Sequence, residues 1–141
     1  MLSVDEYRAD ILDGIGVLVP IELPLSAAHG CVLAADVVAP WPLPSFDNSS
    51  MDGYAVRVAD VANATVDAPV VLKVIDDVPA GFRSTEEIVS GTAVRIMTGA
   101  PMPEGAEAVV PVEDTDGAME SVSVTRAVDR GAYIRLSLIH I

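Results

Sequence analysis

The sequence has few positive charges and a single cysteine, and each shortage excludes a class of protein. Only 8 Lys and Arg residues stand against 21 Asp and Glu residues, which gives a formal net charge of −13. Nucleic-acid binding needs patches of Lys and Arg that meet the phosphates, so we expect no nucleic-acid partner. Because Cys31 has no second cysteine to pair with, an intramolecular disulfide and a cysteine-rich zinc site are both excluded.

Long apolar runs are also missing. No segment approaches the roughly 20 apolar residues that a membrane helix needs, and the opening residues MLSVDEYRAD carry acids where a secretory signal carries bases and an apolar run. We therefore expect a soluble, cytoplasmic protein with no membrane partner. The hydrophobic fraction of 51% is nevertheless high enough to build a core in one or two small domains.

The N-terminal residues predict a short helix. Ser3 can cap the helix, and Glu6 three residues later completes a capping box. Four apolar residues then recur at helical spacing and form one stripe: Tyr7, Ile11, Leu12 and Ile15. Ordinary core packing is the favoured account of this stripe, and an interface with a partner subunit is the alternative.

The segment after Pro20 predicts an extended region. Two apolar runs, at 21–25 and 31–38, indicate short strands on either side of a turn. Three alternate prolines at 40–44 follow, and they fix an extended backbone that acts as a stiff connector. Residues 1–45 are therefore expected to form a helix and linker region.

Beyond the connector, the pattern is that of an all-β domain covering 46–135. Five segments predict strands, separated by turns rich in glycine and proline: 54–56, 70–75, 92–97, 108–112 and 121–125. The expected fold class is thus mostly β with a short N-terminal helix (α+β), with the β-rich part a small barrel or sandwich-like domain.

The loop FDNSSMDGYAV, at 46–56, is the first candidate site. Its oxygen-bearing side chains, on Asp47, Asn48, Ser49, Ser50 and Asp52, are the hard ligands that Mg²⁺ prefers. Gly53 allows a sharp turn or the close approach of a ligand. The alternative is a turn whose side chains bond their own backbone, and spacing alone favours this alternative.

The stretch GTAVRIMTGAPMPEG, at 91–105, is the second candidate. A predicted strand runs into Thr98 and Gly99, where a hydroxyl and backbone N–H groups could meet phosphate or ribose. No Walker lysine and no dinucleotide-binding helix follows, so neither of those motifs is present. Taken alone, this stretch is better explained as a hairpin.

Together, the two loops resemble the signature stretches of the molybdopterin molybdenumtransferase family, which includes the bacterial MoeA proteins and domains of plant and animal relatives such as gephyrin. The matching stretches are PLPSFDNSSMDGYAV at 42–56 and GTAVRIMTGAPMPEGAEAVVPVED at 91–114. The resemblance runs from about residue 3 to residue 135. It implies that 1–45 belongs to MoeA domain I and that 46–135 is domain II.

The resemblance implies the last step of molybdenum cofactor synthesis, a Mg²⁺-dependent transfer of molybdate into adenylylated molybdopterin with release of AMP. Asp52 and Thr98 match catalytic positions, with Asp52 also at the metal. The same motifs imply substrate binding by five further residues: Asn48, Ser49, Ser50, Gly53 and Gly99. For the asparagine and the serines, the alternative is that they only hold the shape of the loop.

Proteins of this family continue into an α/β domain and a small β-barrel, and their active site forms between two subunits. The resemblance therefore implies a homodimer whose interface includes the N-terminal helix. The ending LSLIHI, at 136–141, departs from the family pattern and is expected to be a truncation artefact, so the fragment should be inactive alone. The alternative is a non-catalytic scaffold or binding module, but retention of Asp52 and Thr98 favours the enzyme.

Overall fold

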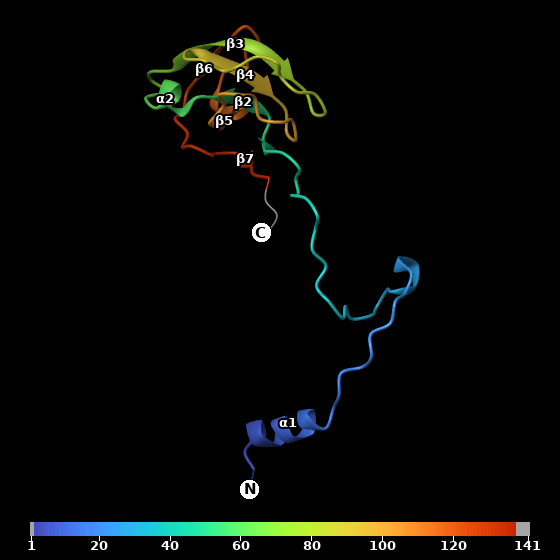
Figure 1. Ribbon diagram of the computed structural model, residues 1–141. Helices are drawn as coiled ribbons and strands as arrows, with labels where there is room; N and C mark the ends of the chain where they lie inside the picture. Colours follow the sequence, from blue (N-terminus) through green and yellow to red (C-terminus); the bar gives the residue numbers. More distant parts are fainter. Residues whose placement is uncertain (1, 138–141) are drawn as a thin grey trace. The chain divides into compact units, whose positions relative to one another are not determined.

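The structure is a computed structural model that describes residues 2–137, and the chain divides into two compact units. Unit 1 is Met1–Val38 and unit 2 is Ala39–Ile141. Figure 1 shows the order of the elements along the chain. Of the tail expected to leave the family pattern, residues 138–141 lie outside the described residues.

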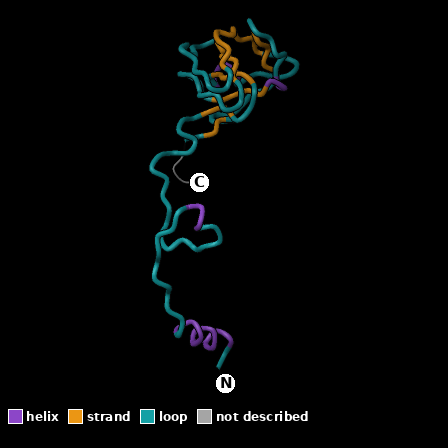
Figure 2. The backbone as a smooth tube through the Cα atoms, turned by 90° about the vertical axis from the view of Figure 1, so that its right-hand side faces the viewer, coloured by secondary structure: helices purple, strands orange, loops and turns teal. Residues whose placement is uncertain are grey.

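Unit 1 contains the helix α1 (Val4–Asp13) and a single 3₁₀ turn, η1 (Leu25–Ala27). The predicted capping box is confirmed, because the Glu6 N–H donates to Ser3 Oγ at 3.3 Å and the Ser3 N–H donates to Glu6 Oε2 at 2.7 Å. The predicted strands at 21–25 and 31–38 are wrong, since the described part of unit 1 contains no strand (Figure 2). These runs have the composition of strands but no neighbouring strand to pair with, and an unpaired strand is not stable by itself.

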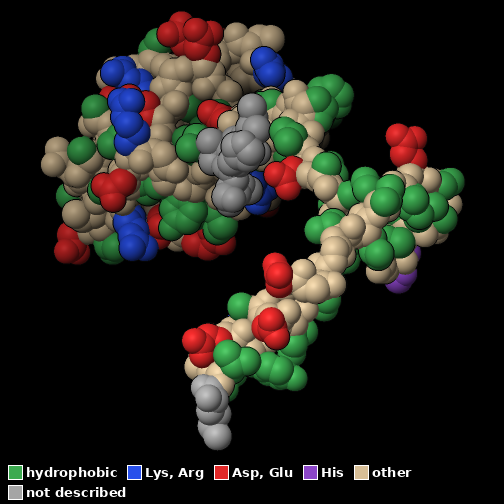
Figure 3. Space-filling model, turned by 60° about the horizontal axis from the view of Figure 1, so that its bottom comes forward, with side chains coloured by type: hydrophobic (Ala, Val, Ile, Leu, Met, Phe, Trp, Pro, Cys, Tyr) green, Lys and Arg blue, Asp and Glu red, His purple; other side chains and the backbone are tan. Residues whose placement is uncertain are grey.

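The apolar stripe of α1 is exposed. The side chains of Tyr7, Ile11, Leu12 and Ile15 are between 48% and 65% exposed, and none of the described residues up to Val38 is buried. Figure 3 shows hydrophobic side chains spread over the surface of this unit. The expectation that the stripe packs into a core is therefore wrong for unit 1, because the described residues of this unit form no buried core.

Unit 2 is built from strands that form two sheets. The larger sheet has the order β5-β2-β4-β3-β6, and all its neighbours are antiparallel except the parallel pair β3 and β4. Its strands are β2 (Gly53–Val56), β3 (Val70–Val78), β4 (Thr92–Ile96), β5 (Ala108–Pro111) and β6 (Ser121–Val124). Each strand overlaps a predicted one, and the expected fold class, mostly β with a short N-terminal helix, is confirmed.

The remaining elements of unit 2 are short. The strands β1 (Asn48–Ser49) and β7 (Ile134–Arg135) pair antiparallel and form the second sheet. One helical turn, α2 (Val58–Val61), follows β2, and a 3₁₀ turn, η2 (Val112–Asp114), follows β5. The larger sheet curls, so that β2 and β5 lie beneath β3 and β6 (Figure 1).

Alternation along the strands produces a core on each face of the curled sheet. Tyr54 and Val56 of β2 pack into one cluster with residues of β3, β5 and β6, whereas Ala55 faces a second cluster that includes Val94 and Ile96. The pairing of β3 with β4 shifts between Val74 and Asp76. Because such a bulge reverses which side chains face each way, Val74 joins the first cluster and Val78 joins the second.

The strand directions bring three loop segments to one edge of the sheet. β3 and β4 are parallel, so their carboxyl ends lie together, and β2 is antiparallel to β4, so β2 begins at the same edge. Asp52 precedes β2 directly, and Thr98 follows β4 after one residue. The fold therefore places the two candidate catalytic residues at the same edge.

Candidate functional site

Asp52 and Thr98 are in direct contact. Asp52 Oδ1 accepts two hydrogen bonds from Thr98, one from the backbone N–H at 2.7 Å and one from the hydroxyl at 2.8 Å. The pairing of Gly53 with Ile96 in the adjacent strands sets this geometry. Both residues are exposed, so the paired carboxylate and hydroxyl are accessible from solvent.

Hydrogen bonding lowers the pKa of the Asp52 carboxyl below its ordinary value. The largest cause is the backbone N–H of Thr98, followed by the Thr98 hydroxyl and by the positive charge of Arg95, while partial desolvation opposes them. Asp52 is therefore an anion at neutral pH, suited to binding a cation or accepting a hydrogen bond. It is not poised to donate a proton.

A tight turn presents Thr98. The Ala100 N–H donates to the Met97 carbonyl at 3.0 Å, and Gly99, at the third position, has φ of +83°. That backbone conformation is costly for a residue with a side chain, which explains the glycine. Gly99 thus shapes the site through its backbone.

Gly53 is required for a different reason. A Cβ placed on this buried glycine would lie 2.0 Å from the carbonyl oxygen of Val110. β2 and β5 pair at this point, with Gly53 opposite Pro111. Gly53 therefore allows a close backbone approach directly beside Asp52.

Asn48 and Ser49 are predicted site residues that the structure buries. Ser49 is 0% exposed and Asn48 is 4% exposed. Ser49 is bonded to the Thr98 turn, because its N–H donates to the Ala100 carbonyl at 3.0 Å and its carbonyl accepts from the Gly99 N–H at 2.8 Å. Its hydroxyl donates to the Met51 carbonyl at 2.5 Å. These contacts match the loop-shaping alternative for the two residues.

Ser50 lies between these buried residues and Asp52 and is half-buried. Its N–H donates to the carbonyl of Tyr133 at 2.9 Å, which ties the loop to the segment that ends in β7. Asn48 Oδ1 is buried and has no hydrogen-bond partner among the described residues, although Asn48 Nδ2 donates to the Phe46 carbonyl at 3.3 Å. The loop at 46–56 is thus held in place by hydrogen bonds to the Thr98 turn and to the C-terminal segment.

The residues present can contribute one ligand to a metal. Among the residues that the structure describes, no group of three or more His, Cys, Asp or Glu side chains could hold a metal ion. Mg²⁺ is commonly bound by one or two carboxylates together with substrate phosphates, and the exposed, ionised Asp52 fits that role.

No helix within residues 2–137 is long and apolar enough to cross a membrane.

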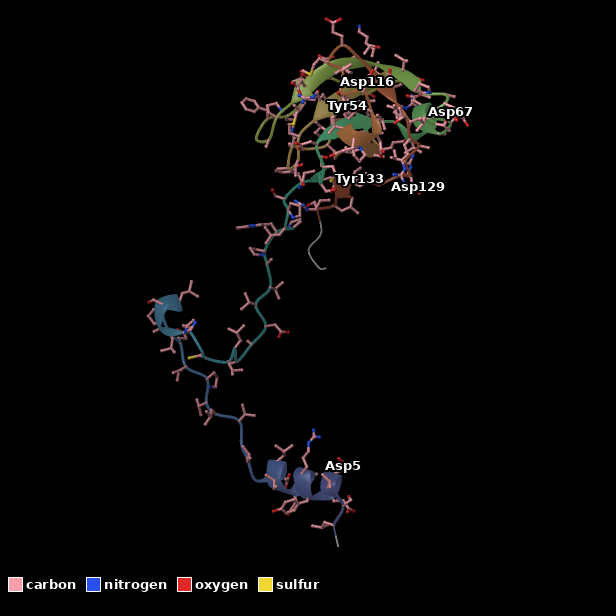
Figure 4. The ribbon with its side chains drawn as sticks, turned by 180° about the vertical axis from the view of Figure 1, so that it is seen from behind. Asp5, Tyr54, Asp67, Asp116, Asp129 and Tyr133 are labelled. Carbon is pink, nitrogen blue, oxygen red and sulfur yellow. The ribbon has the colours of Figure 1, made fainter. Side chains whose placement is uncertain are left out.

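Sequence reasoning missed the polar residues that surround β2. The buried Tyr54 donates its hydroxyl to the Ala118 carbonyl at 2.9 Å, and burial raises its pKa. Asp116 holds the receiving turn by accepting from the N–H groups of Ala118 at 3.2 Å and Ser123 at 3.1 Å (Figure 4). The buried Tyr54 ring and its hydrogen bond thus anchor β2 two residues after Asp52, and no spacing of residues signals this long-range contact.

A shallow pocket of about 340 Å³ was also missed. It is lined by residues 126–129, with Asp114, Ala132 and Tyr133. Figure 4 shows Asp129 and Tyr133 lying close together. The distinctive local feature of this pocket is the backbone of Tyr133, a non-glycine residue with φ of +57°. A sequence does not reveal backbone conformation, so this feature could not have been predicted.

The comparison with known proteins decides the family. A family model described as the MoeA N-terminal region (domain I and II) matches residues 2–137. The chain belongs to the MoeA family. It is 49% identical over 137 residues to molybdopterin molybdenumtransferase 2 of Mycobacterium tuberculosis H37Rv, which covers 97% of this chain and 34% of that protein.

Two further relatives agree with this assignment. Molybdopterin molybdenumtransferase 1 of Mycobacterium tuberculosis H37Rv is 37% identical over 150 residues, covering 96% of this chain and 35% of that protein. The crystal structure of the molybdopterin biosynthesis MoeA protein from Pyrococcus horikoshii OT3 matches with a TM-score of 0.76 at 38% identity, covering 82% of this chain and 30% of that one. The family resemblance is confirmed, and the chain spans about a third of the length of the curated relatives that it matches.

Proposed function

We propose that this chain is the N-terminal part of a molybdopterin molybdenumtransferase, which inserts molybdate into adenylylated molybdopterin and releases AMP in molybdenum cofactor biosynthesis. The observation that carries the proposal is the exposed Asp52–Thr98 pair, in a chain 49% identical to a relative named for this activity. A scaffold has no use for an ionised carboxylate held at an open edge by a threonine.

Asp52 and Thr98 have distinct roles in this proposal. Thr98 donates two hydrogen bonds to Asp52 Oδ1, which orients the carboxylate and keeps it ionised. Asp52 would then hold Mg²⁺, which when bound offsets the negative charge of the substrate phosphates. A protein with 21 acidic and 8 basic residues needs such an offset to bind a nucleotide anion.

The other five predicted residues support binding in two ways. Gly99 and Ser50 are half-buried beside the pair and would meet substrate mainly through their backbone. Gly53, Asn48 and Ser49 are buried and would act by holding the loop in shape. The reaction also needs residues beyond this chain, so we expect the fragment to be inactive alone.

The proposal includes the assembly and the location of the protein. Residues 1–45 would be part of MoeA domain I and residues 46–135 would be domain II. The exposed apolar side chains of α1 would be covered in a homodimer, and the enzyme would act in the cytoplasm. A homodimer would also complete the site, because in the family arrangement another subunit supplies its second half.

A chimera tests the proposed activity. Residues 1–137 would replace the matching part of the Mycobacterium tuberculosis relative that is 49% identical, in a host that lacks its own transferase. We expect the chimera to restore molybdoenzyme activity, and Asp52→Ala and Thr98→Ala each to lower it by about 100-fold or more, as loss of a positioned polar group in an active site does. Asp67→Ala, at an exposed aspartate just before β3, is the matched control and should retain full activity.

Two results would count against the proposal. Full activity of the Asp52→Ala chimera would favour the alternative, a non-catalytic scaffold or binding module. Turnover by the isolated 141-residue chain would overturn the part of the proposal that expects the fragment to be inactive alone.

A further inference from the structure

The Thr98 turn has a counterpart on the neighbouring strand. β3 ends at Val78 and β4 ends at Ile96, and these two residues pair in register. In each case a four-residue turn follows at once, closed by the Phe82 N–H on the Pro79 carbonyl at 3.1 Å and by the Ala100 N–H on the Met97 carbonyl at 3.0 Å. Gly81 and Gly99 occupy the same turn position, with φ of +87° and +83°.

The two turns lie side by side at the edge that carries Asp52. The Met97 N–H donates to the Val78 carbonyl at 3.0 Å, so the parallel ladder continues to the first residue of the Thr98 turn. Adjacent strands are about 4.8 Å apart. The turn at 79–82 is therefore about one strand spacing from Thr98, on the side away from Asp52.

This second turn presents an aromatic residue. Phe82 is 67% exposed and belongs to neither core cluster. Its neighbour Arg83 is also exposed and brings a positive charge to an edge that contains the carboxylates of Asp76 and Asp77. Single exposed apolar residues are common on protein surfaces, so exposure alone carries no argument.

The anchoring of the loop makes this exposure significant. At the start of the loop, the hydrogen bond from the Phe82 N–H to the Pro79 carbonyl holds the Phe82 backbone. On the other side, the Ser84 hydroxyl donates to Asp76 Oδ2 at 2.7 Å and accepts from the Glu86 N–H at 3.1 Å, and Ile88 is buried in the second core. Phe82 is thus held outward by a loop that is fixed at both ends, which is how a rigid binding platform is built.

We propose that Phe82 forms a stacking platform for the planar heteroaromatic ring of a ligand whose phosphate lies at the Asp52–Thr98 pair. The inference rests on the proposed function, which supplies two such rings, the purine of the nucleotide and the pterin. An aromatic side chain stacks on either ring, since both present a π-face. Arg83 would lie beside the platform and attract the negative charge of the ligand.

A titration followed by ¹⁵N NMR on the 141-residue chain, in a buffer that contains Mg²⁺, tests this inference. The probes are AMP, which carries a purine and a phosphate, neopterin monophosphate, which carries a pterin and a phosphate, and ribose 5-phosphate, which carries a phosphate but neither ring. We expect AMP or neopterin monophosphate to shift the amide signals of residues 80–83, and the ring that does so identifies the source. Phe82→Ala should weaken that binding about tenfold or more, whereas Phe82→Tyr, which keeps a ring, should preserve it.

Val66→Ala is the matched control, because Val66 is 79% exposed and precedes β3, at the opposite end of that strand. Three outcomes would overturn the inference: shifts confined to Thr98 and Gly99 with unchanged affinity in Phe82→Ala, equal binding of ribose 5-phosphate, or no shift at 80–83 with millimolar probe. None of these outcomes decides the proposed activity, which the chimera tests separately.

Discussion

At the scale of single residues, Asp52 is held at two points by one partner, and this contact makes the state of the carboxylate depend on Thr98. Replacing Thr98 by Val removes the hydroxyl donor but keeps the backbone N–H, which is the larger cause of the lowered pKa. The pKa of Asp52 should therefore rise towards 3.8 without reaching it. A ¹³C NMR titration of the Asp52 carboxyl in both proteins measures the change.

The lowered pKa also sets the direction of a pH effect on stability. A carboxyl whose pKa is lower in the folded than in the unfolded state stabilises the fold above its unfolded pKa, and this contribution disappears as the pH falls through the folded pKa. Through this contact, the free energy of unfolding of Thr98→Val should be lower than that of the unsubstituted protein at neutral pH. The difference should vanish in acid, where Asp52 is protonated in both proteins. A difference between the two proteins that stays constant down to the lowest pH would contradict this account.

Gly53 makes a second prediction at this scale. Its missing Cβ would lie 2.0 Å from the Val110 carbonyl oxygen, and both sides of that contact are paired backbone that cannot move apart cheaply. Gly53→Ala should lower the free energy of unfolding by about 3 kcal/mol, at the upper end of overpacking effects. Urea denaturation measures it, with Gly16→Ala as the control, since nothing lies within 4 Å of the new methyl group there. Equal stability of the two variants would contradict the prediction.

At the scale of elements, the smaller of the two sheets holds the loop at 46–56 in place. β7 pairs with β1, and the Tyr133 carbonyl just before β7 accepts the Ser50 N–H at 2.9 Å. A chain that ends at Ala132 should therefore exchange the Ser50 amide about tenfold faster, because the carbonyl that accepts its N–H is lost together with β7. The Ser49 amide bonds to Ala100 and is the internal control in hydrogen exchange. Equal acceleration of both amides would mean that the loop is released as a whole.

The elements also show what a sequence can predict. The five strands of the larger sheet were predictable because their valine-rich, alternating patterns coincide with strands that have partners. The runs at 21–25 and 31–38 have the same composition but no neighbouring strand to pair with. For these runs, β propensity therefore predicted strands that the structure does not contain. β1 and β7 contain two residues each, too few for any periodicity, and only long-range pairing defines them.

The site was predictable to a different extent. Spacing alone favoured ordinary turns for both loops, and only the family resemblance linked Asp52 with Thr98, which the structure brings into contact. The burial of Ser49 and the role of Tyr54 depend on residues far away in the chain. The match between the turns at Gly81 and Gly99 depends on the parallel pairing of β3 and β4, which the sequence does not reveal.

At the scale of the whole molecule, the burial is confined to one unit. The first buried residue in the described part of the chain is Asn48, and unit 1 carries exposed apolar side chains along α1 and after it. A helix of 10 residues is only marginally stable in water by itself. Unit 1 therefore needs a covering surface, and the proposed homodimer supplies one.

This requirement gives a prediction for the assembly. A partner that binds only the folded state stabilises it by mass action, so the stability of a dimer rises with protein concentration. The melting temperature of the whole chain should therefore increase with concentration, and that of residues 39–141, which contain every buried residue described, should not. Differential scanning calorimetry across a 100-fold range of protein concentration measures both melting temperatures. Over that range, mass action stabilises the dimer by about 2.7 kcal/mol at most. A melting temperature of the whole chain that is independent of concentration would contradict the proposed homodimer.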